Sequence, residues 1–326
     1  MPDATAFWVE RPGVGRLRRE TLPRRETADV HVKTQFTAVS RGTETSVFGG
    51  HVPASEYERM RAPFQSGDFP GPVKYGYLNV GTVEHGPDSL TGRTVFTLFP
   101  HQSAFVVPAD AVTLVPADVP ARRAVLAGAV ETAINVLWDA VPALGDRICI
   151  VGAGMIGSSV ARLARGIPGA TVTLVDLDPT RRATAELLGV NFAESTQPPT
   201  AQDIVINTSG SPAGLQLALE TVVTDGVVVE ASWYGDRPVT LALGADFHAR
   251  RLTIRSSQVG AVSTTRRGSR SSSDRLTLAL EFLRDPAFDT LLTGESSWRA
   301  LPELMASLAD GSRSDLCHTI DWSDAE

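Results

Sequence analysis

The residues with the clearest chemical meaning are three glycines that follow an apolar run. Gly152, Gly154 and Gly157 come directly after the run 147–151, and the residues behind them have the composition of a helix. In such a turn the first glycine allows a sharp bend, the second lets the backbone approach a pyrophosphate, and the third lets helix and strand pack closely. The start of the helix also directs unpaired N–H groups at the phosphates. The expected dinucleotide-contacting residues are Gly152, Gly154, Met155, Ile156 and Gly157. The alternative is a glycine-rich turn of some other α/β protein.

An acidic residue closes the next apolar run. Asp176 ends the run 171–176 and stands 19 residues after Gly157. Its carboxylate would accept hydrogen bonds from a ribose diol and repel a 2′-phosphate, which favours NAD over NADP as the cofactor. Arg181 and Arg182 follow closely and keep NADP open, because either could attract a phosphate or stack on adenine.

A third polar segment follows the apolar run 203–207. It reads Thr208, Ser209, Gly210 and Ser211. After the third strand of a dinucleotide-binding domain, such a segment is expected to contact the cofactor. Its serines could equally cap the next helix, and the two roles are compatible.

The elements that would position these residues change character along the chain. From residue 121 onward, strand-like runs alternate with helical stretches, which predicts a doubly wound parallel sheet of the Rossmann type. Residues 1–120 show short apolar segments between Gly, Pro and polar turns, which predicts a β-rich domain with one short helix at 54–60. The expected strands are 148–151, 171–176, 203–207, 227–230, 252–255 and 316–320, and the expected helices are 124–140, 155–165, 179–188, 212–222, 276–283 and 301–308. The expected domains are 1–123, 124–258 and a C-terminal return at 259–326.

Composition argues against several classes of function. The 326 residues carry a formal net charge of −7 and a pI of about 5.5, which gives no support to nucleic-acid or anionic-membrane binding. Cys149 and Cys317 have no CxxC neighbour, which argues against a disulfide framework or a cysteine-rich zinc site. No apolar leader opens the sequence, and no apolar run approaches the roughly 20 residues of a membrane span. We expect a cytosolic protein that acts on a small molecule.

The order of a β-rich half, a helix, a Rossmann domain and a C-terminal return resembles the medium-chain dehydrogenase/reductase superfamily over nearly the whole chain. The resemblance rests on Arg41-Gly-Thr-Glu44, the segment 76–83, the segment 92–95 and the glycine turn at 152–157. It implies a GroES-like catalytic domain beside the Rossmann domain, and hydride transfer between a nicotinamide cofactor and a substrate. The pair Gly76-Tyr77, in place of Gly-His, is similar to the branch that contains bacteriochlorophyllide dehydrogenases. From this branch we take the reaction type and not the substrate.

Many members of this superfamily hold a catalytic zinc with a cysteine, a histidine and a second cysteine or acid. At the matching positions this chain has Arg41, Tyr77 and the stretch 127–132, in which Glu131 is the only candidate ligand. A phenol and one carboxylate do not make a zinc site, and an arginine would repel the ion. We therefore expect a zinc-independent protein.

Without a metal, protein side chains must polarise the substrate oxygen. Tyr77 is the leading candidate acid/base; Arg41 could lower its pKa, and the alternative is that Tyr77 only fills the vacated metal space. Arg41 could instead clamp a substrate carboxylate or pair with Glu44 or Glu131. Thr43 matches a hydroxyl that relays protons in zinc members. Glu131, in an apolar helix, must be paired or protonated, so it is either a second acid/base or a structural ion-pair partner.

Several other residues carry weaker expectations. Glu44 is expected to pair with Arg41. His101 could line the cleft, but a place at the barrel surface or a structural role is favoured for it. His51 is expected in a loop that faces either substrate or solvent. The segment 252–259 is expected to pair across a two-fold axis in a homodimer. A solvated loop is expected to hold the arginines 266, 267, 270 and 275, the alternative being an anion- or partner-binding segment.

These features together predict an NAD(P)-dependent oxidoreductase that interconverts an alcohol and a carbonyl in a small or medium-sized metabolite. One alternative is a quinone or enoyl reductase, in which the hydride goes to a conjugated carbon. The other is a protein that binds NAD without catalysis and acts as a sensor or an assembly partner.

Overall fold

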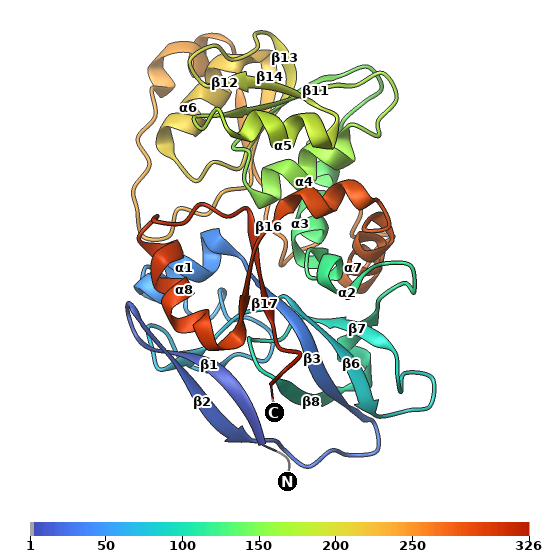
Figure 1. The fold of residues 1–326 in the computed structure, drawn as a ribbon. Coiled ribbons are helices and arrows are strands. Elements are labelled where there is room, and N and C mark those ends of the chain that lie inside the picture. The colour runs from blue at the N-terminus through green and yellow to red at the C-terminus, as the bar shows by residue number, and fades with distance from the viewer. Residues whose placement is uncertain (1–2, 326) are drawn as a thin grey trace. The chain divides into compact units, whose positions relative to one another are not determined.

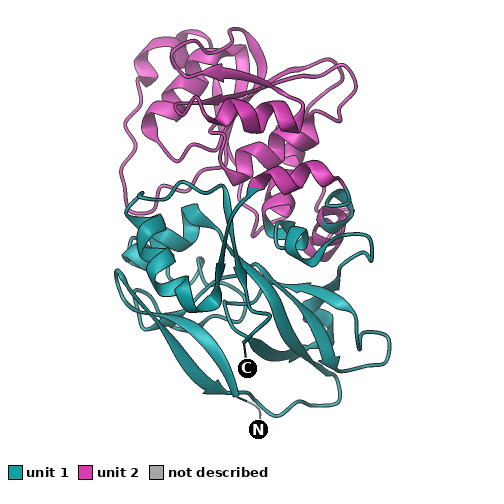
Figure 2. Cartoon of the chain, in the orientation of Figure 1, with its two compact units in different colours: residues 1–128, 280–284, 292–326 teal, residues 129–279, 285–291 magenta. Residues whose placement is uncertain are grey.

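The chain folds into two compact units (Figures 1 and 2). The computed structural model describes residues 3–325. Unit 1 takes the chain up to Gly128 together with 280–284 and the residues from Leu292 onward, and unit 2 takes 129–279 and 285–291. Domain boundaries were expected after residues 123 and 258, and the structure divides the chain after residues 128 and 279.

Unit 2 holds a six-stranded sheet in which every neighbouring pair of strands is parallel. The strand order is β12-β11-β10-β13-β14-β15, so the chain moves outward from β10 to one side and then returns to build the other side. Ligands of such sheets bind at this reversal, beyond the carboxyl ends of the strands. The doubly wound sheet expected from the sequence is confirmed. Its strands are β10 (Arg147–Val151), β11 (Thr171–Asp176), β12 (Asn191–Glu194), β13 (Gln202–Asn207), β14 (Val222–Glu230) and β15 (Thr253–Ser256).

The helices of unit 2 begin and end close to the expected positions. Ser211 and Pro212 show why one of them starts where it does: the Ser211 hydroxyl accepts the Gly214 N–H at 3.0 Å, and Pro212 is the first helical residue. The helix expected at 124–140 is instead a short turn, α2 (Ala121–Ala124), followed by α3 (Ala127–Ala140). The others are α4 (Met155–Ala164), α5 (Arg181–Leu188), α6 (Pro212–Thr221) and α7 (Ser272–Phe282), whose last residues fall in unit 1.

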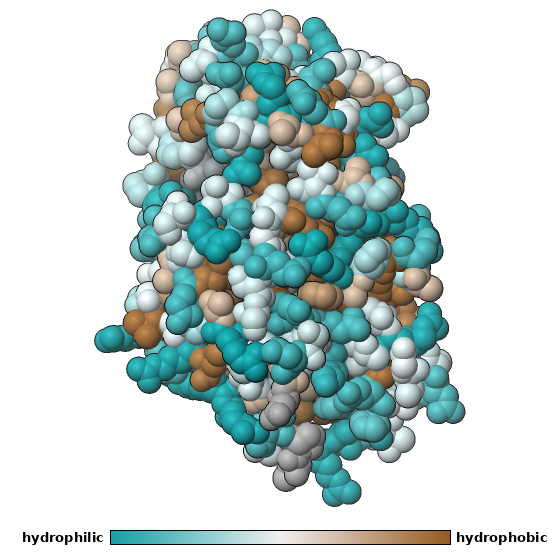
Figure 3. Space-filling model, in the orientation of Figure 1, coloured by the Kyte–Doolittle hydropathy of each residue, from teal (hydrophilic) through white to brown (hydrophobic). Residues whose placement is uncertain are grey.

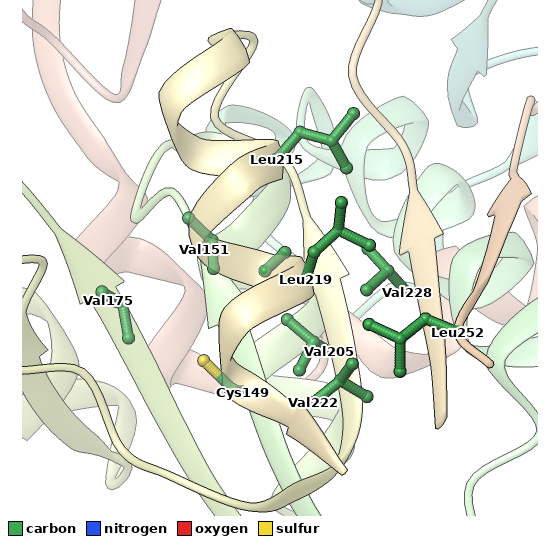
Figure 4. Close-up of a cluster of buried hydrophobic side chains, with 10 residues drawn as sticks. Cys149, Val151, Val175, Val205, Leu215, Leu219, Val222, Val228 and Leu252 are labelled. Carbon is green, nitrogen blue, oxygen red and sulfur yellow. The ribbon is translucent and has the colours of Figure 1, made fainter. Parts of the chain in front are cut away.

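Apolar side chains of α6 and the strands form a core of unit 2 (Figure 4). Leu215 and Leu219 of α6 pack against Val205 of β13 and Val228 of β14, and all four are at most 4% exposed. Burying each such side chain stabilises the fold by about 1.5–3 kcal/mol. Cys149 belongs to the same cluster, and burial raises the pKa of its thiol to about 12, so it behaves as an apolar core residue.

Unit 1 contains two sheets. The smaller has the order β2-β1-β5-β4, and the larger runs β16-β17-β3-β6-β7-β9 with β8 paired to β3. The strand expected at 316–320 is found as β17, which lies parallel to β16 and antiparallel to β3. The strands of unit 1 are β1 (Asp3–Arg11), β2 (Val14–Thr21), β3 (Asp29–Val39), β4 (Ser66–Gly67), β5 (Val73–Lys74), β6 (Asn79–His85), β7 (Thr94–Thr97), β8 (Ala104–Pro108), β9 (Val112–Leu114), β16 (Leu292–Ser297) and β17 (Cys317–Asp321).

A helix that the sequence did not predict interrupts the β-rich half. This is α1 (Arg41–Gly49), which starts after Ser40 and ends at Gly50, a residue with a φ of +76° that closes the helix. The Glu44 carboxylate accepts the Ser40 N–H at 2.7 Å, so an acid inside the first turns satisfies a donor at the helix start. The helix expected at 54–60 is only a short 3₁₀ turn (Ala54–Glu56). Unit 1 is completed by α8 (Leu301–Ala309).

The face drawn in Figure 3 mixes polar and apolar side chains without one large apolar area. Exposed apolar side chains do occur singly, among them Leu144 at 75% and Leu177 at 81% exposure. Across residues 3–325, no helix combines the length and the apolar character that crossing a membrane would require.

Candidate functional site

The glycine turn of unit 2 shows three different steric situations. Gly152 has a φ of +102°, and a Cβ there would lie 2.8 Å from the Ser209 backbone. A Cβ on Gly157 would lie 1.9 Å from the Gly152 carbonyl oxygen, so this position also excludes any side chain. A Cβ on Gly154 would have no atom within 4 Å. Gly152 and Gly157 are thus required by the fold, whereas the open space at Gly154 would let a ligand approach the backbone closely. Met155 and Ile156 begin α4, as expected for a helix N-terminus beside a pyrophosphate.

Asp176 is tied to this turn. One of its carboxylate oxygens accepts the Ala153 N–H at 2.7 Å, and the other accepts the Asp178 N–H at 2.9 Å. A carboxylate has about four acceptor positions, so capacity for a ribose diol remains. The following arginines face carboxylates of their own: Arg181 lies 3.4 Å from Asp178, and Arg182 lies 3.8 Å from Glu194 and over the Phe192 ring. Their charges are therefore partly balanced before any phosphate arrives.

The segment after β13 is held against the same turn. The Thr208 hydroxyl donates to the Gly152 carbonyl oxygen at 2.8 Å, and Gly210, with a φ of +64°, donates its N–H to the Ser232 hydroxyl at 3.0 Å. Ser209 donates its hydroxyl to the Asn207 side chain at 2.8 Å. Ser211 caps the N-terminus of α6, which is the helix-capping role considered for this segment. The segment 208–210 thus lies beside the glycine turn, where contact with a cofactor was expected.

Sequence reasoning missed a polar cluster at the carboxyl ends of β13 and β14. Asn207, fully buried, donates to the Glu230 carboxylate at 2.7 Å, and the Tyr234 hydroxyl donates to the same carboxylate at 3.0 Å. The Ser232 N–H donates to the other Glu230 oxygen at 2.7 Å. Burial, and then the Glu230 charge, raise the pKa of Tyr234. The sequence signal that could have predicted this cluster is that β13 and β14, two consecutive parallel strands, end in the polar residues Asn207 and Glu230.

In unit 1, Tyr77 lies beside the start of α1. It is half-buried, and the side chains of Ser40 and Thr43 lie near its hydroxyl. Burial and the Glu44 carboxylate raise the pKa of Tyr77 to about 12, although Ser40 and Thr43 act in the opposite direction. Because desolvation dominates, the pKa of Tyr77 is raised and not lowered. Arg41 is the half-buried first residue of α1.

Glu44, whose charge acts on Tyr77, forms a buried pair with His101. Glu44 is 3% exposed and His101 is 1% exposed, and the Glu44 Oε2 lies 2.8 Å from the His101 Nε2. The His101 Nδ1 lies 2.7 Å from the Thr37 hydroxyl. Glu44 thus bonds to His101 and to the Ser40 N–H. Of the two places favoured for His101, the structural one is found, because its side chain is buried and does not lie at the surface. The other histidine considered, His51, is exposed.

Glu131 of α3 is also paired. Its carboxylate lies 3.0 Å from the Arg275 guanidinium, and the two side chains are 7% and 2% exposed. Burial raises the pKa of Glu131, and Arg275 partly offsets the rise. The structural alternative for Glu131 is thus observed. Placing Arg275 in a solvated loop was wrong, because it belongs to α7; Arg266, Arg267 and Arg270 are exposed as expected.

The three positions that would hold a catalytic zinc do not fit the ion. They carry the guanidinium of Arg41, the phenol of Tyr77 and the methyl group of Ala127. Glu131 lies one turn after Ala127, but its carboxylate is already paired with Arg275. Zinc prefers thiolates, imidazoles and unpaired carboxylates. Over the part of the chain that the structure describes, no three His, Cys, Asp or Glu side chains gather as metal ligands would.

Comparisons with solved structures place this architecture among known folds; no protein-family model matches the sequence. L-idonate 5-dehydrogenase from Escherichia coli K-12 aligns with a TM-score of 0.80 at 14% identity over 98% of both chains. An alcohol dehydrogenase from E. coli CFT073, crystallised with NADH, aligns at 0.77 and 14% identity over 98% of this chain and 100% of its own. A proposed zinc-binding dehydrogenase from Sinorhizobium meliloti 1021, bound to NADP, aligns at 0.79 and 16% identity over 98% and 100%. At these identities the likeness establishes the fold.

Proposed function

We propose, from the premise that this chain has the two-domain fold of the medium-chain dehydrogenases, that it is a zinc-independent NAD(P)-dependent oxidoreductase. It would interconvert an alcohol and a carbonyl in a small or medium-sized metabolite. The observation that carries the proposal is the pair of sites: a glycine turn with open space at Gly154 in unit 2, and a protonated Tyr77 at a former metal-ligand position in unit 1. Neither site alone would define the reaction.

The cofactor site would be built from the glycine turn, the start of α4, Asp176 and the segment 208–210. The turn and the helix N-terminus would hold the pyrophosphate through backbone N–H groups. Asp176 would accept hydrogen bonds from the ribose diol and would repel a 2′-phosphate, so NAD is favoured over NADP. A bound nicotinamide supplies or accepts the hydride.

Tyr77 would supply the proton. Because its pKa is raised to about 12, the phenol is protonated at neutral pH and can donate a hydrogen bond to a carbonyl oxygen, and then the proton as the alcohol forms. Ser40 and Thr43 lie near its hydroxyl and stabilise the phenolate left behind. Arg41, in the same helical turn as Thr43, would bind an anionic group of the substrate. Glu131, already paired, would support the fold of α3 rather than transfer a proton.

The first test is Tyr77→Phe. General acid catalysis contributes about 10²- to 10⁴-fold, so kcat for carbonyl reduction should fall at least about 100-fold while the NADH dissociation constant stays unchanged. Steady-state kinetics over a panel of ketones and aldehydes, with cofactor binding by fluorescence, would measure both. Tyr57→Phe is the matched control, since the Tyr57 ring packs on Phe69 and not on Ser40 or Thr43.

Three outcomes would contradict the proposal. Full turnover in Tyr77→Phe would remove the acid role from Tyr77. One tightly bound zinc per purified chain would contradict the metal-free mechanism. Consumption of quinones or activated alkenes, without any alcohol-dependent reduction of NAD, would indicate the reductase alternative.

The second test addresses the choice of cofactor. Asp176→Asn keeps the shape of the side chain but loses the charge, so NAD binding should weaken about 10- to 100-fold, the effect of losing a hydrogen bond to a charged group. NADP binding should hold or improve because the repulsion of its phosphate is gone. Titration calorimetry with both cofactors would measure this, with the exposed Glu186→Gln as the control. Equal losses for NAD and NADP would remove Asp176 from the ribose site.

We also propose a homodimer built on β15. This strand ends the sheet order of unit 2, so its outer edge can pair with the same strand of a second copy. Sedimentation should give twice the chain mass of 34.7 kDa. A monomer that persists at high concentration would contradict the proposal.

A further inference from the structure

A buried carboxylate and imidazole lie next to Tyr77 and have no part in the mechanism so far. The Glu44 Oε1 accepts the Ser40 N–H at 2.7 Å, and the Glu44 Oε2 lies 2.8 Å from the His101 Nε2. Both side chains are at most 3% exposed. Burying a carboxylate this deeply is costly, so both of its oxygens must be bonded, as they are here.

The hydrogen bonds on the far side of His101 define its tautomer. A carboxylate only accepts, so the His101 Nε2 carries the proton. The Trp322 indole N–H donates to the Thr37 hydroxyl at 2.9 Å, which leaves the Thr37 proton to be donated to the His101 Nδ1 at 2.7 Å. A neutral imidazole gives every donor and acceptor in this chain a partner.

Two contacts connect the pair to Tyr77. The first runs through Ser40, whose N–H is held by Glu44 and whose side chain lies close enough to the Tyr77 hydroxyl to lower its pKa. The second runs through Gly76, the residue before Tyr77: a Cβ there would lie 3.0 Å from the His101 Cδ2 and 3.3 Å from its Nε2. Gly76 has a φ of +132°, so both the backbone shape and the imidazole ring require glycine at this position.

We propose that Glu44 and His101 are positioning residues for Tyr77: they place its hydroxyl through Ser40 and Gly76, with the Glu44 carboxylate close to the phenol. This inference rests on the proposed function, in which Tyr77 donates the proton. The titratable groups around the Glu44 carboxylate are Tyr75 and Tyr77 ahead of β6, His101, and Cys317 of β17. Among them, only Tyr77 is half-exposed and close to Ser40 and Thr43.

The test replaces Glu44 by Gln, which keeps the shape and removes the charge. The chain has four tyrosines, so ¹³Cζ-tyrosine NMR resolves each phenol, and Tyr77→Phe identifies the signal of Tyr77. In Glu44→Gln the Tyr77 signal should begin to titrate of order one pH unit lower than in the wild type, because a neighbouring like charge is gone. The kcat for carbonyl reduction should fall, with the substrate KM little changed, because an amide has one acceptor oxygen and cannot hold both the Ser40 N–H and the His101 Nε2–H in place. Glu58→Gln, an exposed substitution of the same kind, should change neither value.

An unchanged titration of Tyr77 in a folded Glu44→Gln protein would overturn the inference. If that variant does not fold, His101→Gln is the second test, because the amide N–H can still bond to Glu44. There kcat should fall with KM and NADH affinity unchanged, and an unchanged kcat would overturn the inference. The NMR measurement needs no substrate, so it can succeed even if Tyr77→Phe remains active and the proposed function fails.

Discussion

Among residues 3–325, each of the two units buries one glutamate, and the two glutamates have partners of different kinds. Glu44 in unit 1 faces an imidazole that is neutral in its hydrogen-bond pattern, whereas Glu131 in unit 2 faces a guanidinium that is always charged. The exposed fractions are similar, at 3% and 5%. The difference therefore lies in the charge of the partner and not in the depth of burial.

The partners also differ in what else they hold. The Arg275 guanidinium donates to Asn135 of α3 and to the backbone carbonyls of Val259 and Ala261, so one cation joins α7, α3 and the chain after β15. His101 has only two nitrogens, and its chain of bonds ends at Thr37 and Trp322. A permanent charge with many donors suits a structural lock, and an imidazole with two bonds beside Tyr77 suits the positioning role proposed for it.

The largest effect that would sharpen this comparison is expected from Arg275→Met. It leaves the Glu131 charge buried without a partner, which costs about 3–5 kcal/mol of unfolding free energy. Urea denaturation followed by circular dichroism would measure the loss. Arg270→Met, five residues earlier in the chain and exposed, should change stability by no more than about 0.5 kcal/mol. Equal small losses in both variants would show that the lock is not structural.

The loss in Arg275→Met should depend on pH. Without Arg275, nothing offsets the burial that raises the pKa of Glu131, so the folded protein binds a proton more tightly than the unfolded chain. Stability then falls as the pH rises from the unfolded glutamate value of about 4.3 toward the higher pKa of the folded state. The deficit of the variant should therefore be smaller at pH 5 than at pH 8, and a pH-independent deficit would contradict the assignment to Glu131.

A smaller effect is expected at the end of the unit 1 network. Thr37→Val keeps the branched shape but leaves the Trp322 N–H and the His101 Nδ1 without their shared partner, which costs about 1–3 kcal/mol. Thermal and urea unfolding would measure the loss against Thr113→Val, on β9 of the same sheet. A loss as large as that of Arg275→Met would erase the distinction between the two buried pairs.

The sequence allowed prediction of those parts of the fold that depend on local patterns. The run at 148–151, the glycine turn and Asp176 are contiguous in the chain and have strict local requirements, so the parallel sheet and the phosphate turn were predictable. Short polar strands such as β12 lack an apolar pattern and were missed.

The partners of buried charges could not be predicted, because they lie far apart in the sequence. Arg275 and Glu131 are separated by 144 positions, and a basic serine-rich stretch resembles a solvated loop until α7 is known to bury its one inward-facing arginine. His101 and Glu44 are separated by 57 positions, and nothing local distinguishes His101 from a surface histidine. The raised pKa of Tyr77 could not be predicted for the same reason, because burial is a property of the folded chain.

The position of β17 has a consequence for how the protein is made. The strand lies inside the larger sheet of unit 1, between β16 and β3, yet it is synthesised almost 300 residues after β3 begins. Unit 2 ends at Leu291, before β17 begins, so all of unit 2 is synthesised while the larger sheet of unit 1 still lacks an inner strand. Until Asp321 emerges, the unpaired edge of β3 is open to association with other nascent chains, which makes the first domain in the sequence the last one to close.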